Sequence, residues 1–301
     1  MKKIISIFLC IALLLLSGCT AKAPQSEKLI AVSFYPVYIF TLNVVGDVKG
    51  VRIECMAEQN TGCLHDYTVT AKDAKLLSDC DVFVVNGAGM EAFVQDLYET
   101  VENLNVLDSS EGTSIICSHS HHEEGHTGNH HHRENSHIWM SVDNATIQVE
   151  NICAGLCELF PQYKEAFREN TDEYIGRLKS LRAEITAAGN TLSGEKVITF
   201  HNAYEYLFSD LGIHIIETIE SDEGGEPSAK ALGSLADTIT AENINALFVE
   251  PDYDGSSAEI LSNETGARVF VLNPVLKGEK NKTAYEDVMR KNLETILKAV
   301  K

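Results

Sequence analysis

The feature that most constrains the fold is a regular alternation, along the whole chain, of short apolar runs with amphipathic stretches of helical period. Runs rich in β-branched and aromatic residues predict strands, and apolar residues recurring every three or four positions predict helices. The expected strands cover residues 29–34, 51–56, 81–86, 105–107, 196–200, 213–219, 246–249 and 268–272. The expected helices cover residues 37–45, 71–77, 91–101, 143–159, 203–211, 229–240, 257–265 and 284–299. Strands alternating with helices form parallel sheets covered on both faces, so the sequence predicts an α/β protein.

One long amphipathic stretch divides this alternation into two halves. Residues 162–190 contain no proline and keep an apolar stripe at spacings of three, four or seven, formed by Tyr163, Phe167, Tyr174, Leu178, Leu181 and Ile185. A helix of this length measures about 43 Å at 1.5 Å per residue. A coiled-coil arm is the alternative, but the heptads are irregular. We therefore expect two α/β lobes, each a parallel sheet with flanking helices, at residues 29–160 and 193–301, joined by one long rigid helix at residues 161–192.

The first 18 residues have the pattern of an export signal. Lys2 and Lys3 precede an apolar run at 4–16, which is too short to cross a hydrocarbon core of about 30 Å as a helix. A secretory signal is therefore favoured over a transmembrane anchor. Ser17-Gly18-Cys19 resembles the bacterial lipobox, whose cysteine is diacylated; the alternative is ordinary cleavage with Cys19 incidental. With 19–28 as a tether, we expect an extracytoplasmic protein held to the cell membrane by lipid.

Charge and cysteine content narrow the class further. The chain of 301 residues has 44 Asp and Glu against 24 Lys and Arg, and this acidic balance argues against nucleic acid as a partner. Outside the signal and Cys19 there are six cysteines, an even number that permits disulfides in an exported protein. Cys55 and Cys63 flank a loop and are the best candidate pair. Cys153 and Cys157 lie four apart on an expected helix, which is a poor arrangement for a bridge.

Histidine is concentrated in one tract. Seven of the 11 histidines fall within 14 residues, namely His119, His121, His122, His126, His130, His131 and His132. The surrounding segment 117–136 is polar throughout, so we expect a solvated loop without a packed core. Its imidazoles can chelate metal ions transiently. Two interpretations remain open: an auxiliary loop that collects zinc, or a dispensable insert that binds metal only because imidazoles do.

Three histidines outside the tract share a different context. His65, His137 and His201 each lie at or near a loop between expected elements, where binding residues concentrate. Neutral imidazole is the commonest ligand of borderline divalent metals, and three imidazoles give three corners of a tetrahedral zinc site. His214 falls inside an expected strand and is interpreted as structural. The sequence thus suggests a three-histidine metal site.

The residues around these histidines resemble a known family. His65-Asp66-Tyr67 is similar to the first-ligand segment of the cluster A-I metal-binding solute-binding proteins. His137-Ile138-Trp139-Met140 looks like their second-ligand segment, and Phe200-His201-Asn202-Ala203-Tyr204 looks like their third. Over essentially the whole mature chain, the sequence resembles a zinc/manganese ABC-transporter substrate-binding lipoprotein of the zinc-uptake type.

This resemblance implies a monomer of two lobes with a metal ion between them, which it delivers to an ABC permease coupled to an ATPase. It also implies a fourth ligand, usually the Asp of a Leu-Asp-Pro segment. Here the segment reads Leu272-Asn273-Pro274, so the candidates for the fourth position are Asn273, Glu250 at the end of an expected strand, or water. A three-histidine site without that Asp favours Zn²⁺ over Mn²⁺.

Competing functions are weighed against this expectation. A Mn²⁺-preferring protein of the same family is the nearest alternative. A zinc hydrolase would share an open three-histidine site, but the sequence contains neither HExxH nor a nucleophile-elbow motif. A surface adhesin is compatible with lipid anchoring. We expect a binding protein for Zn²⁺ import and not an enzyme.

Overall fold

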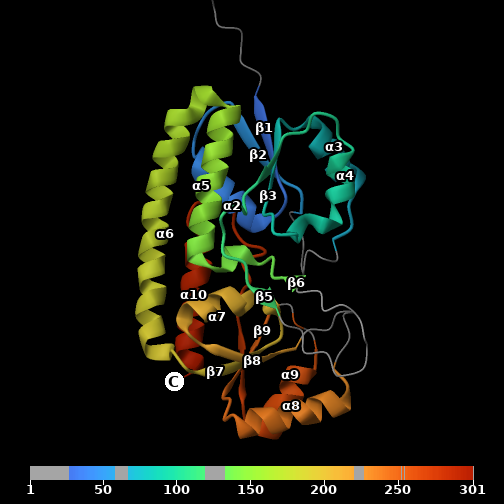
Figure 1. Ribbon diagram of the computed structural model, residues 1–301, viewed down its shortest axis with the longest axis vertical. Helices are drawn as coiled ribbons and strands as arrows, with labels where there is room; N and C mark the ends of the chain where they lie inside the picture. Colours follow the sequence, from blue (N-terminus) through green and yellow to red (C-terminus); the bar gives the residue numbers. More distant parts are fainter. Residues whose placement is uncertain are drawn as a thin grey trace, which may run out of the picture.

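The first lobe is built on a four-stranded parallel sheet. The structure is a computed structural model that describes residues 27–57, 67–118, 133–219, 227–251, 253 and 255–300. The sheet has the order β2-β1-β3-β4 and every neighbouring pair is parallel. Its strands are β1 (Lys28–Val32), β2 (Val51–Cys55), β3 (Val82–Val85) and β4 (Val106–Asp108). This lobe is the upper one in Figure 1.

Alternate residues of the central strands point into two different cores, as the period of a strand requires. In β1, Ile30 and Val32 join the core on the side of α2 (Tyr35–Val45) and α5 (Val142–Leu159). Leu29 and Ala31 join a second core under α3 (Ala71–Asp79) and α4 (Gln95–Glu99). The sheet is therefore covered on both faces, which is why its central strands β1 and β3 are nearly continuous apolar runs.

The second lobe repeats this plan with its own four-stranded parallel sheet. The order is β10-β9-β7-β8. The strands are β7 (Lys196–Thr199), β8 (His214–Thr218), β9 (Ala246–Val249) and β10 (Arg268–Val271). One face packs on α8 (Ala229–Ala241) and α9 (Ser257–Thr265). The other face packs on α7 (Glu205–Leu211) and lies toward α10 (Ala284–Ala299).

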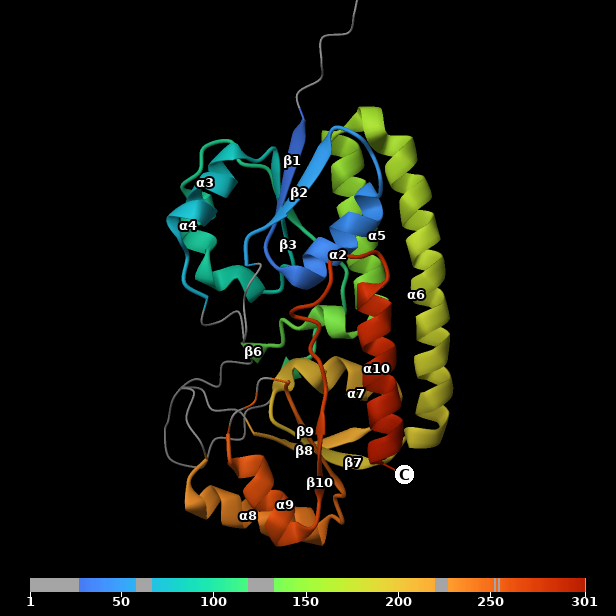
Figure 2. The same ribbon diagram turned by 180° about the vertical axis from the view of Figure 1, so that it is seen from behind.

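The long helix α6 (Lys164–Leu192) has 29 residues and runs beside both lobes (Figures 1 and 2). It packs against α2 and α5 of the first lobe and against α7 and α10 of the second. Its buried face carries Phe167, Tyr174, Leu181 and Ile185, all members of one apolar core that includes strand residues of both sheets. The predicted fold class, two parallel-sheet lobes and one long helix, is confirmed.

The structure differs from the expected elements at residues 91–101. Instead of one helix, a 3-10 helix η2 (Met90–Phe93) and the short α4 meet at Val94, whose backbone is not helical (φ −122°, ψ 0°). Glu91 is buried, and its carboxylate accepts the backbone N–H groups of Asn86 and Gly87 at 2.7 and 3.1 Å. The end of β3 therefore holds this carboxylate, and the chain enters the segment in a geometry that does not continue as one helix.

The ends of segment 117–136, expected as loop, form a short antiparallel pair of strands. β5 (Cys117–Ser118) pairs with β6 (Arg133–Glu134), and the N–H of Asn135 donates to Ile116 O at 2.8 Å. Pairing satisfies backbone groups that a polar sequence leaves without a packed partner. The seven clustered histidines themselves, at residues 119–132, lie outside the described residues.

Several other predictions concern residues outside the described part of the chain. The signal, the lipobox with Cys19 and most of the tether fall within residues 1–26, and Cys63, the suggested partner of Cys55, falls within 58–66. Among the helices that are described, none is both long and apolar enough to cross a membrane. Three further 3-10 helices are η3 (Ile138–Met140), η4 (Pro161–Tyr163) and η5 (Asn202–Tyr204).

Candidate metal centre

His137 and His201, two of the three predicted ligands, lie beside each other between the lobes. Their ring centroids are 4.8 Å apart and the ring planes meet at 84°. His137 directly precedes η3, and His201 follows the end of β7 by two residues. Both histidines thus lie in short connections between regular elements. Their role as metal ligands stays a prediction, but the structure brings the two imidazoles together.

The orientation of the His137 ring is set by Asn135. His137 Nδ1 lies 2.9 Å from Asn135 Oδ1, which also accepts the backbone N–H of His137 at 3.0 Å. The amide nitrogen of Asn135 donates to Asn202 O and to Glu205 Oε2, both at 2.9 Å, which fixes the oxygen toward His137. An oxygen that can only accept requires a proton on Nδ1. Nε2 is then the basic nitrogen, the one that can coordinate a metal ion.

His201 is oriented in the same way by a carboxylate. Its Nδ1–H donates to Glu250 Oε1 over 2.6 Å, a short charge-assisted hydrogen bond. The side chains of His201 and Glu250 are 15% and 22% exposed. Glu250 follows β9 directly, so neighbouring parallel strands deliver the imidazole and its acceptor to the same edge. A carboxylate on Nδ1 of a histidine whose Nε2 is basic is the usual outer-shell arrangement at metal sites.

The segment 272–274 is tied to both histidine-bearing elements. Trp139, two residues after His137, donates its Nε1–H to Pro274 O at 2.9 Å. Tyr204, three residues after His201, donates its hydroxyl to Leu272 O at 2.5 Å. Burial raises the pKa of Tyr204 well above its ordinary value, so this hydroxyl stays protonated and keeps donating. The two bonds hold the segment with Asn273 against the histidine pair.

Asn273, a candidate for the fourth ligand, uses its polar groups in its own turn. Its Oδ1 accepts the backbone N–H of Val275 at 2.8 Å. Its backbone N–H donates to Asn292 Oδ1 at 2.9 Å, and its carbonyl accepts from Asn292 Nδ2 at 2.7 Å. The amide oxygen of Asn273 is thus already engaged in a hydrogen bond within the turn.

The third predicted ligand, His65, lies outside the described residues, as do the seven histidines of the tract. The residues on either side of the gap at 58–66 do come together, since the hydroxyl of Tyr67 lies 3.3 Å from Met56 O. Within the part of the chain that is described, no group of three or more His, Cys, Asp or Glu side chains is arranged to hold a metal ion. His214, the fourth isolated histidine, is exposed at the first residue of β8.

Two residues that orient a candidate ligand escaped the sequence analysis. Asn135 and Glu205 orient His137 but carry none of the features by which a metal ligand is recognised. For Asn135 the signal was its place two residues before His137, a spacing at which an amide oxygen can accept both the backbone N–H and the ring N–H. Glu205 gives no comparable signal, because only the fold brings it to Asn135.

Comparison with known proteins decides the family. The ZnuA family, described as "Zinc-uptake complex component A periplasmic", matches residues 30–299. The chain belongs to the ZnuA family. The resemblance noted from the three histidine segments is thereby confirmed. The matched residues include both lobes and the long helix between them.

Two curated relatives of this ZnuA-family chain are named for zinc. Zinc-binding lipoprotein AdcA of Streptococcus pneumoniae is 31% identical over 310 residues, covering 98% of the chain and 60% of that protein. The chain spans 56–60% of the length of the AdcA relatives that it matches first. High-affinity zinc uptake system protein ZnuA of Bacillus subtilis is 29% identical over 282 residues, covering 90% of the chain and 88% of that protein.

Solved structures share the ZnuA-family fold. The Zn(II)-bound structure of Streptococcus pneumoniae AdcA superimposes with a TM-score of 0.74 at 27% identity, covering 91% of this chain and 58% of that one. FpvC of Pseudomonas aeruginosa in complex with Ni²⁺ gives a TM-score of 0.78 at 25% identity, covering 91% and 97%. The same architecture therefore occurs in complexes with two different divalent ions.

Proposed function

We propose that this protein captures Zn²⁺ outside the cytoplasm and delivers it to an ABC permease powered by an ATPase on other chains. The observation that carries the proposal is the His137–His201 pair, with ring centroids 4.8 Å apart and each Nδ1 on an oxygen acceptor. Both rings then present a basic Nε2, as zinc coordination requires. Membership of the ZnuA family and the zinc-binding names of its relatives support the same function.

The proposed ligands are His65, His137 and His201, with water as the fourth. Glu250 was a candidate for that position, but its hydrogen bond to His201 Nδ1 suits a residue that orients a ligand. Asn273 was the other candidate, and its oxygen already accepts the N–H of Val275. A site of three imidazoles and one water has the tetrahedral geometry of zinc, with Zn–N distances near 2.0–2.1 Å.

Three neutral imidazoles also favour Zn²⁺ over Mn²⁺. Carboxylates and water suit the harder Mn²⁺, whereas imidazole suits Zn²⁺ and its neighbours in the first transition row. The Ni²⁺ complex of FpvC shows that this fold does not by itself dictate the ion. Selectivity in this chain is thus proposed to come from the donor set, which contains no carboxylate ligand.

The proposed place of action is the outer face of the cell membrane. Residues 1–18 would direct export, and diacylation of Cys19 would anchor a monomer beside its permease through the short tether. The relative AdcA is named a lipoprotein, and the family description is periplasmic, which supports an extracytoplasmic, membrane-held protein. Such a protein would have no catalytic step of its own.

The ligand set is tested by zinc competition titration of the purified protein and of three variants, His65→Ala, His137→Ala and His201→Ala. Each loss of an imidazole should weaken the tightest zinc site by more than about a hundredfold, the upper range for loss of an outer-shell partner. The matched control is His214→Ala, an exposed histidine that should keep full affinity. Retention of the tight site in any of the three variants would remove that residue from the set.

The histidine tract is proposed to collect zinc and pass it to this site. Because β5 and β6 pair at its base, residues 119–132 can be replaced by an Asn-Gly turn that closes the hairpin. The shortened protein should keep the tight site and lose the weaker zinc equivalents. Cells that carry it should take up zinc more slowly under deep zinc limitation. Unchanged uptake there would leave the tract without a collecting role.

A further inference from the structure

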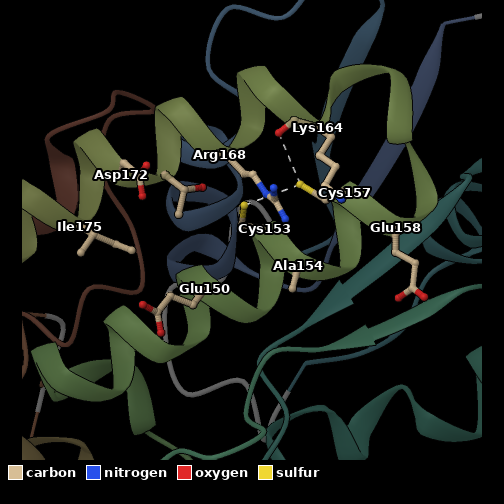
Figure 3. Close-up of a pocket in the computed structure, with 10 residues that line it drawn as sticks. Glu150, Cys153, Ala154, Cys157, Glu158, Lys164, Arg168, Asp172 and Ile175 are labelled. Carbon is tan, nitrogen blue, oxygen red and sulfur yellow. Dashed lines mark hydrogen bonds between the residues drawn. The ribbon is translucent and has the colours of Figure 1, made fainter.

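Two cysteines face a groove between α5 and α6, on the outer side of the first lobe (Figure 3). Cys153 and Cys157 lie one helical turn apart on α5, and both are buried free thiols. Their sulfur atoms are 3.9 Å apart. The groove has a volume of about 500 Å³, and neither His137 nor His201 lines it.

The sulfur–sulfur distance matches two ligands of one tetrahedral ion. With zinc–sulfur bonds of about 2.3 Å and a tetrahedral angle, two thiolates on one zinc ion are about 3.8 Å apart, and the larger Cd²⁺ holds them slightly farther apart. A disulfide would need the sulfurs to close to about 2.05 Å. Neighbouring turns of one rigid helix hold the pair near the first distance and far from the second. The spacing that disfavours a bridge therefore favours chelation.

The charges that surround the thiols suit an exchange of protons for a divalent cation. Glu150 and Glu158 on α5 and Asp172 on α6 line the groove together with two cations, Lys164 and Arg168. Figure 3 shows Arg168 reaching from α6 toward the sulfurs. When one divalent ion binds and two thiol protons leave, the net charge of the groove does not change. Neither bare thiolates nor an uncompensated cation is created in the groove.

A buried threonine hydroxyl without a hydrogen-bond partner among the described residues lines the same groove. Thr171 on α6 lines the groove and is only 5% exposed. Its Oγ1 has no hydrogen-bond partner among the described residues. A buried hydroxyl normally has a hydrogen-bond partner, so the Thr171 hydroxyl requires a further group beside it in the groove. A water molecule on a metal ion held by the two sulfurs would supply that group.

We propose that Cys153 and Cys157 form a dithiolate site for a soft d¹⁰ divalent cation, of which Cd²⁺ is the probe. On binding, two S–H bonds break, two metal–sulfur bonds form and two protons pass to solvent, with no electron transfer. Burial, followed by the neighbouring Cys153, raises the pKa of the Cys157 thiol to about 11, against the lowering effect of Arg168 and Lys164. At neutral pH the Cys157 thiol is therefore protonated, and strongly thiophilic ions are the ones that displace such a proton.

The experiment is a Cd²⁺ titration of the reduced full-length protein, read by ultraviolet thiolate-to-metal charge transfer and by cadmium-edge absorption spectroscopy. We expect one ion with two sulfur neighbours. Cys153→Ser and Cys157→Ser should each weaken this binding by at least about tenfold. The matched control is Cys80→Ser, at a free cysteine between α3 and β3 that does not line the groove, and it should change nothing. A thiolate signal that persists in both groove variants would overturn the proposal.

A second measurement needs no substitution of a buried cysteine. In the unmodified protein, one equivalent of Cd²⁺ should slow alkylation of Cys153 and Cys157, followed by peptide mass spectrometry, while Cys80 reacts as before. Equal alkylation with and without Cd²⁺ would overturn the dithiolate site even if both serine variants failed to fold. The same protection in His137→Ala shows that this site stands apart from the proposed zinc site, so either can fail alone.

Discussion

Glu250→Gln tests whether Glu250 orients His201 for the proposed binding of zinc. Glu250 Oε1 accepts Nδ1–H of His201 at 2.6 Å, and an ionised carboxylate can only accept. Glutamine has nearly the same shape but no charge, and its amide presents either an oxygen or an N–H group to the ring. The substitution therefore leaves the packing in place and removes the group that keeps the proton on Nδ1.

The expected loss can be bounded from the geometry. Removal of a hydrogen-bond partner from a metal-bound histidine weakens binding by about 10–100-fold. The His201 and Glu250 side chains are 15% and 22% exposed, so solvent screens part of the interaction and places the effect in the lower half of that range. We expect a loss of about 10–30-fold in zinc affinity, which is about 1.4–2 kcal/mol at about 1.4 kcal/mol per tenfold change.

The assay is competition between the protein and a chelator of known zinc affinity, with zinc-edge spectroscopy on the same samples. Glu217→Gln, an exposed carboxylate on β8 of the same sheet, is the control. Wild type and Glu250→Gln should show the same number of nitrogen and oxygen neighbours. An affinity within about twofold of wild type, against the 10–100-fold range for such partners, would refute the orienting role. Loss of an oxygen neighbour would show that Glu250 is itself a ligand.

Three further substitutions follow from single contacts. Asn273→Ala removes the acceptor for the Val275 N–H and should lower the free energy of unfolding, measured in urea, by about 1 kcal/mol. A clear loss of zinc affinity would instead identify Asn273 as a ligand. Trp139→Phe leaves the Pro274 carbonyl without its hydrogen-bond donor and should lower the free energy of unfolding by about 1–3 kcal/mol. An unchanged free energy of unfolding would contradict this prediction. Burial raises the pKa of Glu91 from 4.5 to about 7, so the folded state holds this proton more tightly. The free energy of unfolding of wild type, relative to that of Glu91→Gln, should thus be greatest below pH 4.5. It should fall by up to about 3 kcal/mol as the pH rises through 7. A difference that does not depend on pH would contradict burial as the cause of the raised pKa.

Much of the fold was predictable because its central strands are buried and its helices keep a regular apolar pattern. The runs at 246–249, 257–265 and 284–299 coincide with β9, α9 and α10, since their apolar pattern and their neighbours point to the same element. The long helix was predictable for the same reason: its stripe keeps one period over 29 residues. Local pattern and tertiary burial agree in these segments.

Prediction failed where a few particular hydrogen bonds determine the backbone. The break at Val94 accompanies a carboxylate buried beneath the end of β3, and the β5–β6 pair joins two ends that a polar tract separates in sequence. Neither arrangement leaves a periodic signal. Their geometry depends on hydrogen bonds between segments, which composition does not encode.

At the candidate metal centre, the histidines could be predicted from the sequence, whereas the orientation of their rings could be seen only in the structure. His137 and His201 were recognisable from their places after expected elements. Glu250 was recognised only as a possible oxygen donor, because its hydrogen bond to His201 depends on the pairing of β9 with β7. Asn135 went unrecognised, since its role arises from two acceptors that the fold places around its amide.

The shared packing of α6 has a consequence for how this protein denatures. A chain with two separate sheets would ordinarily melt in two steps, one for each lobe. Here Phe167 and Tyr174 in the first half of α6, and Leu181 and Ile185 in the second half, belong to a single core. Neither lobe can lose its structure without exposing the helix that the other requires. Thermal unfolding should therefore be one cooperative transition, and an ion bound between the lobes should raise the melting temperature of the whole chain.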